Sequence, residues 1–154
     1  MSVGLSWQIE GSKQLSRVLQ GIGEGVKDWT PAFKETADEL TKVFSNDVFS
    51  TEGGAIGEAW KPLNPQYLSK KLADGYPADT LVRTGAMQGA FKSMFKSDFA
   101  EVWNSIEYFK YHQSKEPRNK IPRRVMMKLG ENQKELITKI FHTYWWKKVN
   151  GKLQ

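Results

Sequence analysis

Apolar side chains recur at two different spacings in the first part of the chain. Between residues 3 and 10 they occupy every second position, a pattern that predicts a strand with one buried face. After Gly11 the spacing changes to three and four residues, and Ser12 is a suitable cap for a helix that begins at Lys13. Three glycines between positions 21 and 25 end this segment. The pattern therefore predicts a strand followed by a short helix.

The clearest helix signal begins at Thr30 and Pro31. Threonine is a favoured N-cap, and proline suits the first helical position because the N–H that it lacks would have no partner there. One apolar stripe at helical spacing then continues to about Phe49. The stripe consists of Phe33, Ala37, Leu40, Phe44 and Val48. Such a stripe is usually buried, so we expect this long helix to lie in the core.

Glycine and proline interrupt the middle of the chain. Residues 50–60 contain three glycines and little periodicity, which predicts a flexible Gly-rich loop. An extended stretch follows, and Asn64 with Pro65 predicts the start of a helix that covers residue 66 to about 72. Residues 74–77 have the composition of a turn.

Helical and alternating spacings come one after the other beyond this turn. Apolar positions predict a helix over residues 86–95, with Thr84 as its cap and Gly85 permitting the close approach of a backbone. Residues 96–104 alternate as a strand does, with a turn at or near residues 97–98. The sequence therefore predicts a helix that leads into a strand.

The C-terminal part contains one further strand and one long helix. Residues 123–129 are a candidate strand, and apolar positions at helical spacing predict a helix over about 132–149. Asn150 and Gly151 terminate this helix. Because helices and strands are segregated rather than regularly alternating, the fold class is α+β. We expect residues 1–154 to form a single domain in which a small antiparallel sheet packs against the long N-terminal-half helix and the C-terminal helix.

Residues 108–113 combine aromatic and polar side chains in one helical turn. Tyr108 and Tyr111 are three positions apart and share a face, so we expect them to anchor the turn in the core. His112 and Gln113 then point away from the anchor, where they can bond a backbone or a partner.

A proline-fixed corner with two arginines follows this turn. Pro122 disfavours the helical conformation at Ile121, so the chain is expected to return to extended structure there. Arg123 and Arg124 come directly after it. Together with the aromatic turn, this arrangement indicates a contact with a fixed geometry rather than a catalytic centre.

The composition limits the classes of protein to which the chain can belong. At 154 residues, with 39% hydrophobic and 12% aromatic residues, the chain is long enough for one domain with a substantial core. A domain of this size buries roughly 70% of its unfolded surface. Cysteine is absent, which excludes disulfides, thiolate metal sites and thiol catalysis. The sequence has no run of eighteen apolar residues, so we expect no membrane span. It also has no basic region followed by an apolar stretch, so we expect no secretory signal.

Charge is unevenly distributed along the chain. Residues 1–113 have a net charge of −2, whereas residues 114–154 carry eleven Lys and Arg against three Asp and Glu and so have a net charge of +8. This asymmetry favours an acidic partner surface or nucleic acid, although a solvated basic helix explains it equally well. Near the end, Tyr144, Trp145, Trp146, Lys147 and Lys148 mix aromatics with charge as single-strand binders do. The aromatics nevertheless follow the spacing of a helix core.

Catalytic patterns are weak throughout the sequence. The two histidines, His112 and His142, are far apart and form no His-x-x-x-His motif, so we expect no metal site. Neither a glycine-rich phosphate loop nor a Gly-x-Ser-x-Gly elbow is present. A pairing of His112 with Glu107 is the sole support for a hydrolase. We therefore expect a non-enzymatic protein without a cofactor.

Four clusters occur in a characteristic order. They are Trp60-Lys61-Pro62-Leu63 followed by Tyr67 and Lys70, then Leu81-Val82-Arg83-Thr84-Gly85, then Tyr108-Phe109-Lys110-Tyr111-His112-Gln113, and finally Ile121-Pro122-Arg123-Arg124. Their order and spacing over about residues 59–129 resemble those of the phage virion morphogenesis, or tail-completion, family. The chain departs from the family pattern at Ser114-Lys115, where relatives usually have an aromatic and a glycine, and at Val125-Met126, where they often have Pro-Phe.

The resemblance implies a structural protein of the phage neck. Proteins of this kind are thought to form rings, commonly of six subunits, that complete the tail and present it to the head connector. The implied location is the virion, after assembly in the host cytoplasm. The implied partners are further copies of the chain and other neck, connector and tail-tube proteins, with transient contact to DNA passing the channel and none to a membrane. The alternative is a basic nucleic-acid-binding accessory protein.

Subunit contacts are expected within the four clusters. We predict that Trp60 anchors a contact that orders the loop over residues 50–60 on assembly. We assign Arg83, Arg123 and Arg124 to inter-subunit or lumen-facing contacts, since a guanidinium binds a carboxylate at two points; solvated surface charges are the alternative. The candidate contact residues are Trp60, Pro62, Tyr67, Arg83, Thr84, Gly85, Tyr108, His112, Gln113, Arg123 and Arg124.

Overall fold

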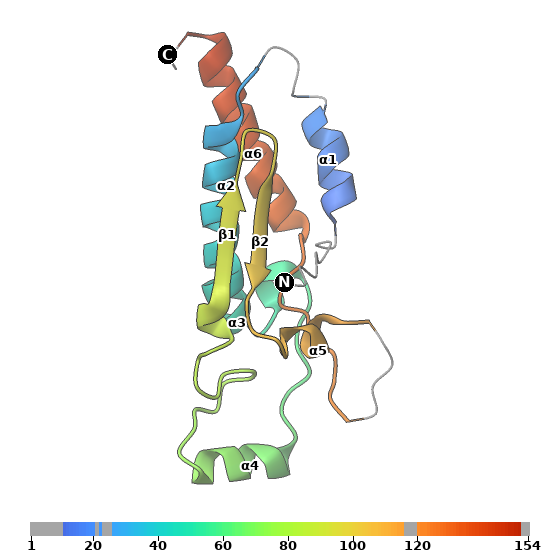
Figure 1. Cartoon of the computed structure of the whole chain (residues 1–154). Helices are drawn as coiled ribbons and strands as arrows, with labels where there is room; N and C mark the ends of the chain where they lie inside the picture. The colour runs from blue at the N-terminus through green and yellow to red at the C-terminus, as the bar shows by residue number, and fades with distance from the viewer. Residues whose placement is uncertain (1–10, 21, 23–25, 116–119, 152–154) are drawn as a thin grey trace.

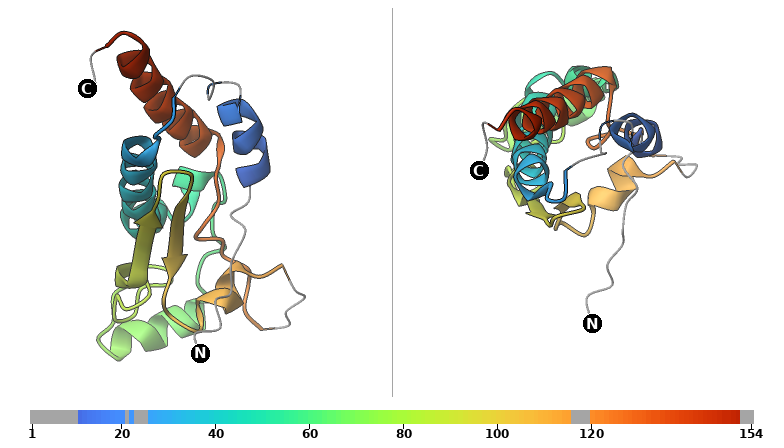
Figure 2. Two further views of the ribbon diagram at one scale, coloured as in Figure 1. Left: turned by 45° about the horizontal axis from the view of Figure 1, so that its top comes forward. Right: turned by 90° about the horizontal axis from the view of Figure 1, so that it is seen from above.

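A β-hairpin and two long helices form the body of the molecule (Figure 1). Helix α2, Thr30–Lys42, contacts strands β1, Phe91–Phe95, and β2, Ala100–Asn104, and it also contacts helix α6, Glu131–Val149. Helix α1, Ser12–Gln20, packs against α6, as Figure 2 shows from two further directions. The expected α+β class, with a small antiparallel sheet beside a long helix and a C-terminal helix, is confirmed.

The computed structural model describes residues 11–20, 22, 26–115 and 120–151. The predicted strand over residues 3–10 lies outside this part of the chain. Within it, no helix combines the length and the apolar composition needed to cross a membrane.

The helix that begins at residue 30 continues to Ser50, as its apolar stripe predicts. Helix α2 passes through a π-helical turn, Val43–Asp47, into helix α3, Val48–Ser50. The wider π-helical turn shifts the apolar stripe by one residue, so that Phe49 is buried as well as Val48. The predicted cap at Thr30 is wrong, because Thr30 is the first helical residue and Trp29 occupies the cap position without a side-chain cap bond. Asp28 Oδ1 accepts hydrogen bonds from the Thr30 backbone N–H and hydroxyl at 2.9 and 2.6 Å, and these bonds lower the pKa of Asp28.

Helix α4, Pro65–Ala73, confirms a local prediction in detail. Asn64 Oδ1 accepts hydrogen bonds from the backbone N–H groups of Gln66 and Tyr67 at 2.9 and 3.4 Å. Proline occupies the first turn, where it needs no N–H. In Figure 1, α4 lies at the end of the molecule opposite to the C-terminal end of α6. We call this the α4 end.

The predicted helix over residues 86–95 is wrong. A short 3-10 turn, Gln88–Ala90, leads directly into β1, which pairs antiparallel with β2 from Phe91 opposite Asn104 to Phe95 opposite Ala100. The predicted strand is also shorter than expected, because residues 96–99 form the turn of the hairpin. Packing explains the difference. The Phe91 ring lies 5.8 to 6.3 Å from those of Phe44, Phe49 and Phe109, so distant contacts override the helical spacing.

Residues 50–60 pack against the body instead of extending from it. They contain a 3-10 turn, Gly54–Ile56, and both Ile56 and Trp60 are buried. Trp60 Nε1 donates a hydrogen bond to the Val125 carbonyl at 2.6 Å. At Gly53, φ is +85° and a Cβ would overlap the Glu58 carbonyl oxygen and the Trp60 ring. The expectation that Trp60 becomes buried only against a neighbouring subunit is therefore wrong, because the single chain already buries it.

Helix α5, Phe109–Gln113, forms where a helical turn is predicted, but its anchor is a different residue. Phe109 is 2% exposed, whereas Tyr108 and Tyr111 are 47% and 51% exposed. The wholly apolar ring fills the space beside Phe91, and the two tyrosines keep their hydroxyl groups near water. The prediction that the tyrosines anchor this turn is wrong.

Candidate functional site

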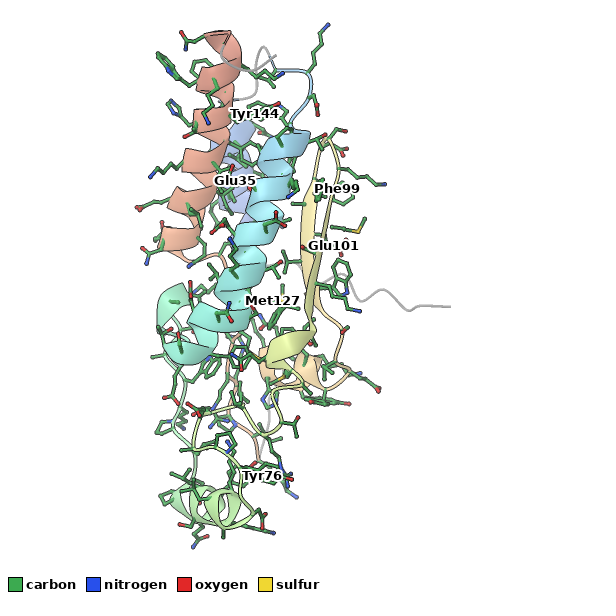
Figure 3. All side chains as sticks on the ribbon, turned by 90° about the vertical axis from the view of Figure 1, so that its left-hand side faces the viewer. Glu35, Tyr76, Phe99, Glu101, Met127 and Tyr144 are labelled. Atoms are coloured by element: carbon green, nitrogen blue, oxygen red, sulfur yellow. The ribbon has the colours of Figure 1, made fainter. Side chains whose placement is uncertain are left out.

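One pocket at the α4 end gathers residues from all four sequence clusters. It has a volume of about 660 Å³, and it is lined by α4, the segments 81–87 and 120–122, Arg124, and Tyr108 and His112 at α5. We call it the α4 pocket. Seven of the eleven predicted contact residues line it, namely Tyr67, Arg83, Thr84, Gly85, Tyr108, His112 and Arg124. Figure 3 shows Tyr76, which lies beside the pocket's Arg83, in the loop next to α4.

The other four predicted residues lie outside the pocket wall. Trp60 belongs to the core, and Pro62 is exposed while its carbonyl accepts a hydrogen bond from the Arg124 guanidinium. Gln113 and Arg123 do not line the pocket either, and Arg123 Nε donates to the Gln113 carbonyl at 3.1 Å.

The Gln113 side chain bonds the backbone of the segment that precedes α6. Its Oε1 accepts from the N–H groups of Met126 and Met127 at 3.0 and 3.1 Å, and its Nε2 donates to the Met127 carbonyl at 2.6 Å. The prediction that Gln113 bonds a backbone is confirmed. The predicted strand over residues 123–129 is instead a buried extended segment with a single bridge residue at Lys128. A side-chain amide here provides hydrogen bonds that a neighbouring strand would otherwise provide.

Arg124 is an internal residue. It is 6% exposed, and its guanidinium donates to the carbonyls of Lys61 and Pro62 at 2.9 and 3.2 Å. Burial lowers the pKa of Arg124, and the charge of Glu52 opposes that shift. The expected surface position of Arg124 is wrong, whereas Arg123 is exposed. The contacts of Arg124 tie the fourth sequence cluster to the first, which gives one wall of the pocket a fixed shape.

Lys71 is a second buried cation in the pocket. It is 5% exposed, and its Nζ donates to the Asp79 carbonyl at 2.6 Å. Burial lowers the pKa of Lys71, the nearby charge of Arg83 lowers it further, and that of Asp79 raises it. Sequence reasoning missed this residue, although its position four residues after Tyr67 places both on one side of α4.

Arg83 lies at the surface of the pocket against an aromatic ring. Its guanidinium carbon is 4.3 Å from the centroid of the Tyr76 ring, a cation–π contact that restricts the side chain. Thr84 Oγ1 accepts a long hydrogen bond from the Ala86 N–H, at 3.4 Å. Gly85 has a φ of +78°, and a Cβ there would meet no atom within 4 Å. The predicted close approach of a backbone to Gly85 is therefore wrong, and the left-handed turn itself accounts for the glycine.

The chemistry of the α4 pocket is that of anion recognition. Four cationic residues line it, namely Lys71, Arg83, Lys120 and Arg124, and no Asp or Glu among the described residues does so. The exposed rings of Tyr67 and Tyr108 add partly apolar surface. In the described part of the chain, no group of three or more His, Cys, Asp or Glu residues is arranged to hold a metal ion.

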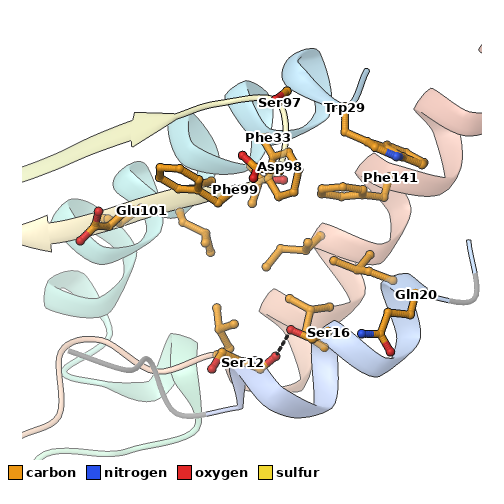
Figure 4. A pocket seen from close by; sticks show the side chains of 18 of the residues that line it. Ser12, Ser16, Gln20, Trp29, Phe33, Ser97, Asp98, Phe99, Glu101 and Phe141 are labelled. Carbon is orange, nitrogen blue, oxygen red and sulfur yellow. Dashed lines mark hydrogen bonds between the residues drawn. The ribbon is translucent and has the colours of Figure 1, made fainter. Parts of the chain in front are cut away.

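A larger cavity of about 760 Å³ lies in the body between α1, α2, β2 and α6 (Figure 4). Its wall is mainly apolar and includes Leu15, Phe33 and Phe141, while Asp98 and Glu101 contribute from the hairpin. None of the predicted contact residues lines it. The α4 pocket is therefore the candidate functional site.

A comparison with known protein families tests the family relationship that the four sequence clusters indicate. The sequence model of the phage virion morphogenesis family matches residues 11–145, which include all four clusters and every element from α1 to most of α6. The chain belongs to the phage virion morphogenesis family. As a member of the phage virion morphogenesis family, the protein has a role in the structure or assembly of the virion. No match was found among curated proteins or among solved structures.

Proposed function

We propose that this protein completes the phage tail and joins it to the head connector as a subunit of an oligomeric ring. The observation that carries the proposal is the convergence of the four family clusters on one pocket, which lies at one end of the molecule. The side chains of Arg124 and Gln113 form hydrogen bonds to backbone atoms, which hold the segments around the pocket in place. These bonds serve a structural purpose and do not arrange groups for a reaction. A surface of this kind suits a permanent contact between proteins.

The proposed role is structural, with no catalytic step, metal or cofactor. We place the protein in the neck of the virion after assembly in the host cytoplasm, with copies of itself, connector proteins and tail-tube proteins as neighbours. A ring requires contacts between two different surfaces of each copy, and such contacts close when the rotation between neighbours divides a full circle. Six copies is the number that the family resemblance suggests.

The proposal is tested by restoring assembly in an extract that lacks the protein. Heads and tails are prepared from phage whose gene for this protein is disrupted, and the purified full chain is added back. We expect joined particles, counted by electron microscopy and by infectivity, to appear only after the addition. Equal joining with and without the protein would contradict the proposal.

A nucleic-acid-binding role is the second candidate, and one observation favours it. Trp146 is 54% exposed near the end of α6 and is followed by Lys147 and Lys148. If this surface carried the function, the chain would bind single-stranded DNA as a monomer, with an affinity that falls steeply as salt rises. Titration of a labelled oligonucleotide at two salt concentrations, together with a mass measurement in solution, separates the two roles.

A further inference from the structure

We propose that the α4 pocket binds acidic side chains from the β1–β2 hairpin of a second copy of this chain, with Arg83 as the residue that receives the carboxylate. This inference rests on the proposed ring and specifies the contact that closes it. It assigns the two unlike surfaces that a head-to-tail contact requires.

Among the described residues, no Asp or Glu lines the pocket to balance its four cations. Lys71 and Arg124 are 5% and 6% exposed, and their hydrogen bonds are to backbone carbonyl oxygens. Asp79 affects the pKa of Lys71 and Glu52 affects that of Arg124, but neither acid lines the pocket, and Glu52 Oε1 already accepts a hydrogen bond from the Thr80 hydroxyl at 2.6 Å. An anion that enters the pocket therefore meets four cationic side chains and no carboxylate among the described lining residues, in partly desolvated surroundings where attraction is stronger than in water.

Arg83 is prepared to bind such an anion. Stacking on Tyr76 restricts the side chain before binding, so less conformational entropy is lost when a ligand is bound. Among the described residues, no hydrogen bond or ion pair occupies the guanidinium of Arg83, so its edge is available for two parallel bonds to one carboxylate. The close charges of Arg83 and Lys71 also repel each other, and an anion between them relieves this repulsion.

The hairpin supplies matching groups. Asp98 and Glu101 are exposed carboxylates without a hydrogen bond or ion pair to any other described residue, and Met94, which lies opposite Glu101 in the hairpin, is 38% exposed. The hairpin also carries the exposed Lys92 and Lys96, so the proposed contact is made by its individual carboxylates and by Met94 rather than by its net charge. Glu101 lies on the body of the molecule and Tyr76 lies near α4 in Figure 3. A contact between these separate regions is head-to-tail, which is the geometry that a ring needs.

A DNA phosphate is a poorer occupant than a side chain. Two of the four cations are recessed and almost fully buried, and Leu81, Val82 and Ile121 line the approach to them. A protein side chain reaches into a recess of this kind, whereas the phosphates of a duplex lie on a broad outer surface. Protein carboxylates are therefore the ligands that the pocket favours.

The first test compares charge reversal inside and outside the pocket in the full chain. Arg83→Glu is measured beside Arg17→Glu, which changes charge equally on the exposed face of α1. We expect Arg83→Glu to raise the dissociation constant of self-association by at least about tenfold, because attraction becomes repulsion. Arg83→Lys, which keeps the charge but loses the planar fork, should cause a smaller increase, and Arg17→Glu should remain within about twofold of the natural chain. Sedimentation equilibrium gives these constants, and circular dichroism verifies that each variant is folded.

The second test exchanges the charges of the proposed partners. Asp98→Lys combined with Glu101→Lys should weaken self-association as Arg83→Glu does, and joining all three substitutions in one chain should restore much of it. Glu35→Lys, at an exposed position on α2, is the matched control and should have little effect. Restored association would support the pairing, and its absence in the triple variant would overturn it.

Three further results would also overturn the inference. These are a natural chain that stays monomeric at all concentrations, unchanged association of Arg83→Glu, and a loss of oligonucleotide binding in Arg83→Glu without any loss of association. The proposed function is judged separately by the joining of heads and tails. If the natural chain restores joining while Arg83→Glu associates normally, the pocket contact alone is wrong. If the natural chain fails to restore joining, the proposed function is wrong.

Discussion

Replacing Gln113 by alanine should destabilise the fold more than its partial exposure suggests. The side-chain amide makes three hydrogen bonds of 2.6 to 3.1 Å to the backbone of Met126 and Met127, which are 0% and 3% exposed. A hydrogen bond contributes about 1 kcal/mol net, and a buried group left without a partner costs about 1–3 kcal/mol. Some water reaches the edge of this site, so we expect a loss of about 2–4 kcal/mol for the three bonds together.

Urea denaturation followed by circular dichroism measures this loss. For a chain of this size the free energy of unfolding falls by about 2 kcal/mol per molar urea, so the midpoint should fall by about 1–2 M. Gln14→Ala, at an exposed position of α1, is the control and should change the free energy by less than about 0.5 kcal/mol. A Gln113→Ala midpoint equal to that of the control would refute the view that this amide replaces a neighbouring strand.

Two further substitutions test the core and its polar contacts. Trp60→Phe removes the hydrogen-bond donor to the Val125 carbonyl and should lower the free energy of unfolding by about 1–3 kcal/mol. The control is Trp146→Phe, at a side chain that is 54% exposed, which should lower it by almost nothing. Equal losses would contradict the assignment of Trp60 to the core. Tyr144→Phe removes a 3.0 Å hydrogen bond to the Asp28 carbonyl and should cost about 1 kcal/mol near neutral pH. Burial raises the pKa of Tyr144 above its value in the unfolded chain, so this group's contribution to stability is complete below pH 10 and declines as the pH rises further; stability curves of the natural chain and Tyr144→Phe should therefore converge in that range, and parallel curves would contradict this.

Elements with local signals could be predicted from the sequence. Helix α4 follows from an Asn cap and a Pro in the first turn, and α6 ends at Asn150 and Gly151, where Gly151 has a φ of +67°. These signals act within a few residues, so no knowledge of the rest of the fold is needed. The local pattern predicts a helix where strand β1 forms, because the packing of Phe91 depends on rings more than forty positions before it and eighteen after it.

The candidate site could be predicted in part. The clusters indicate most of the α4 pocket, because they combine arginines, tyrosines and a turn glycine with a recognisable order. Which arginine is internal does not follow from that order, since Arg123 and Arg124 are adjacent and the burial of Arg124 depends on the carbonyls of Lys61 and Pro62. The stacking of Arg83 on Tyr76 likewise has no counterpart in the local pattern.

An image of the intact virion neck tests the central claim most directly. Cryo-electron microscopy of the assembled particle, with the chain fitted into the density, should show copies of this protein in a closed ring between the tail tube and the connector, with the α4 pocket at each junction between copies. Isolated copies at the neck, or particles that contain none of this protein, would contradict the account.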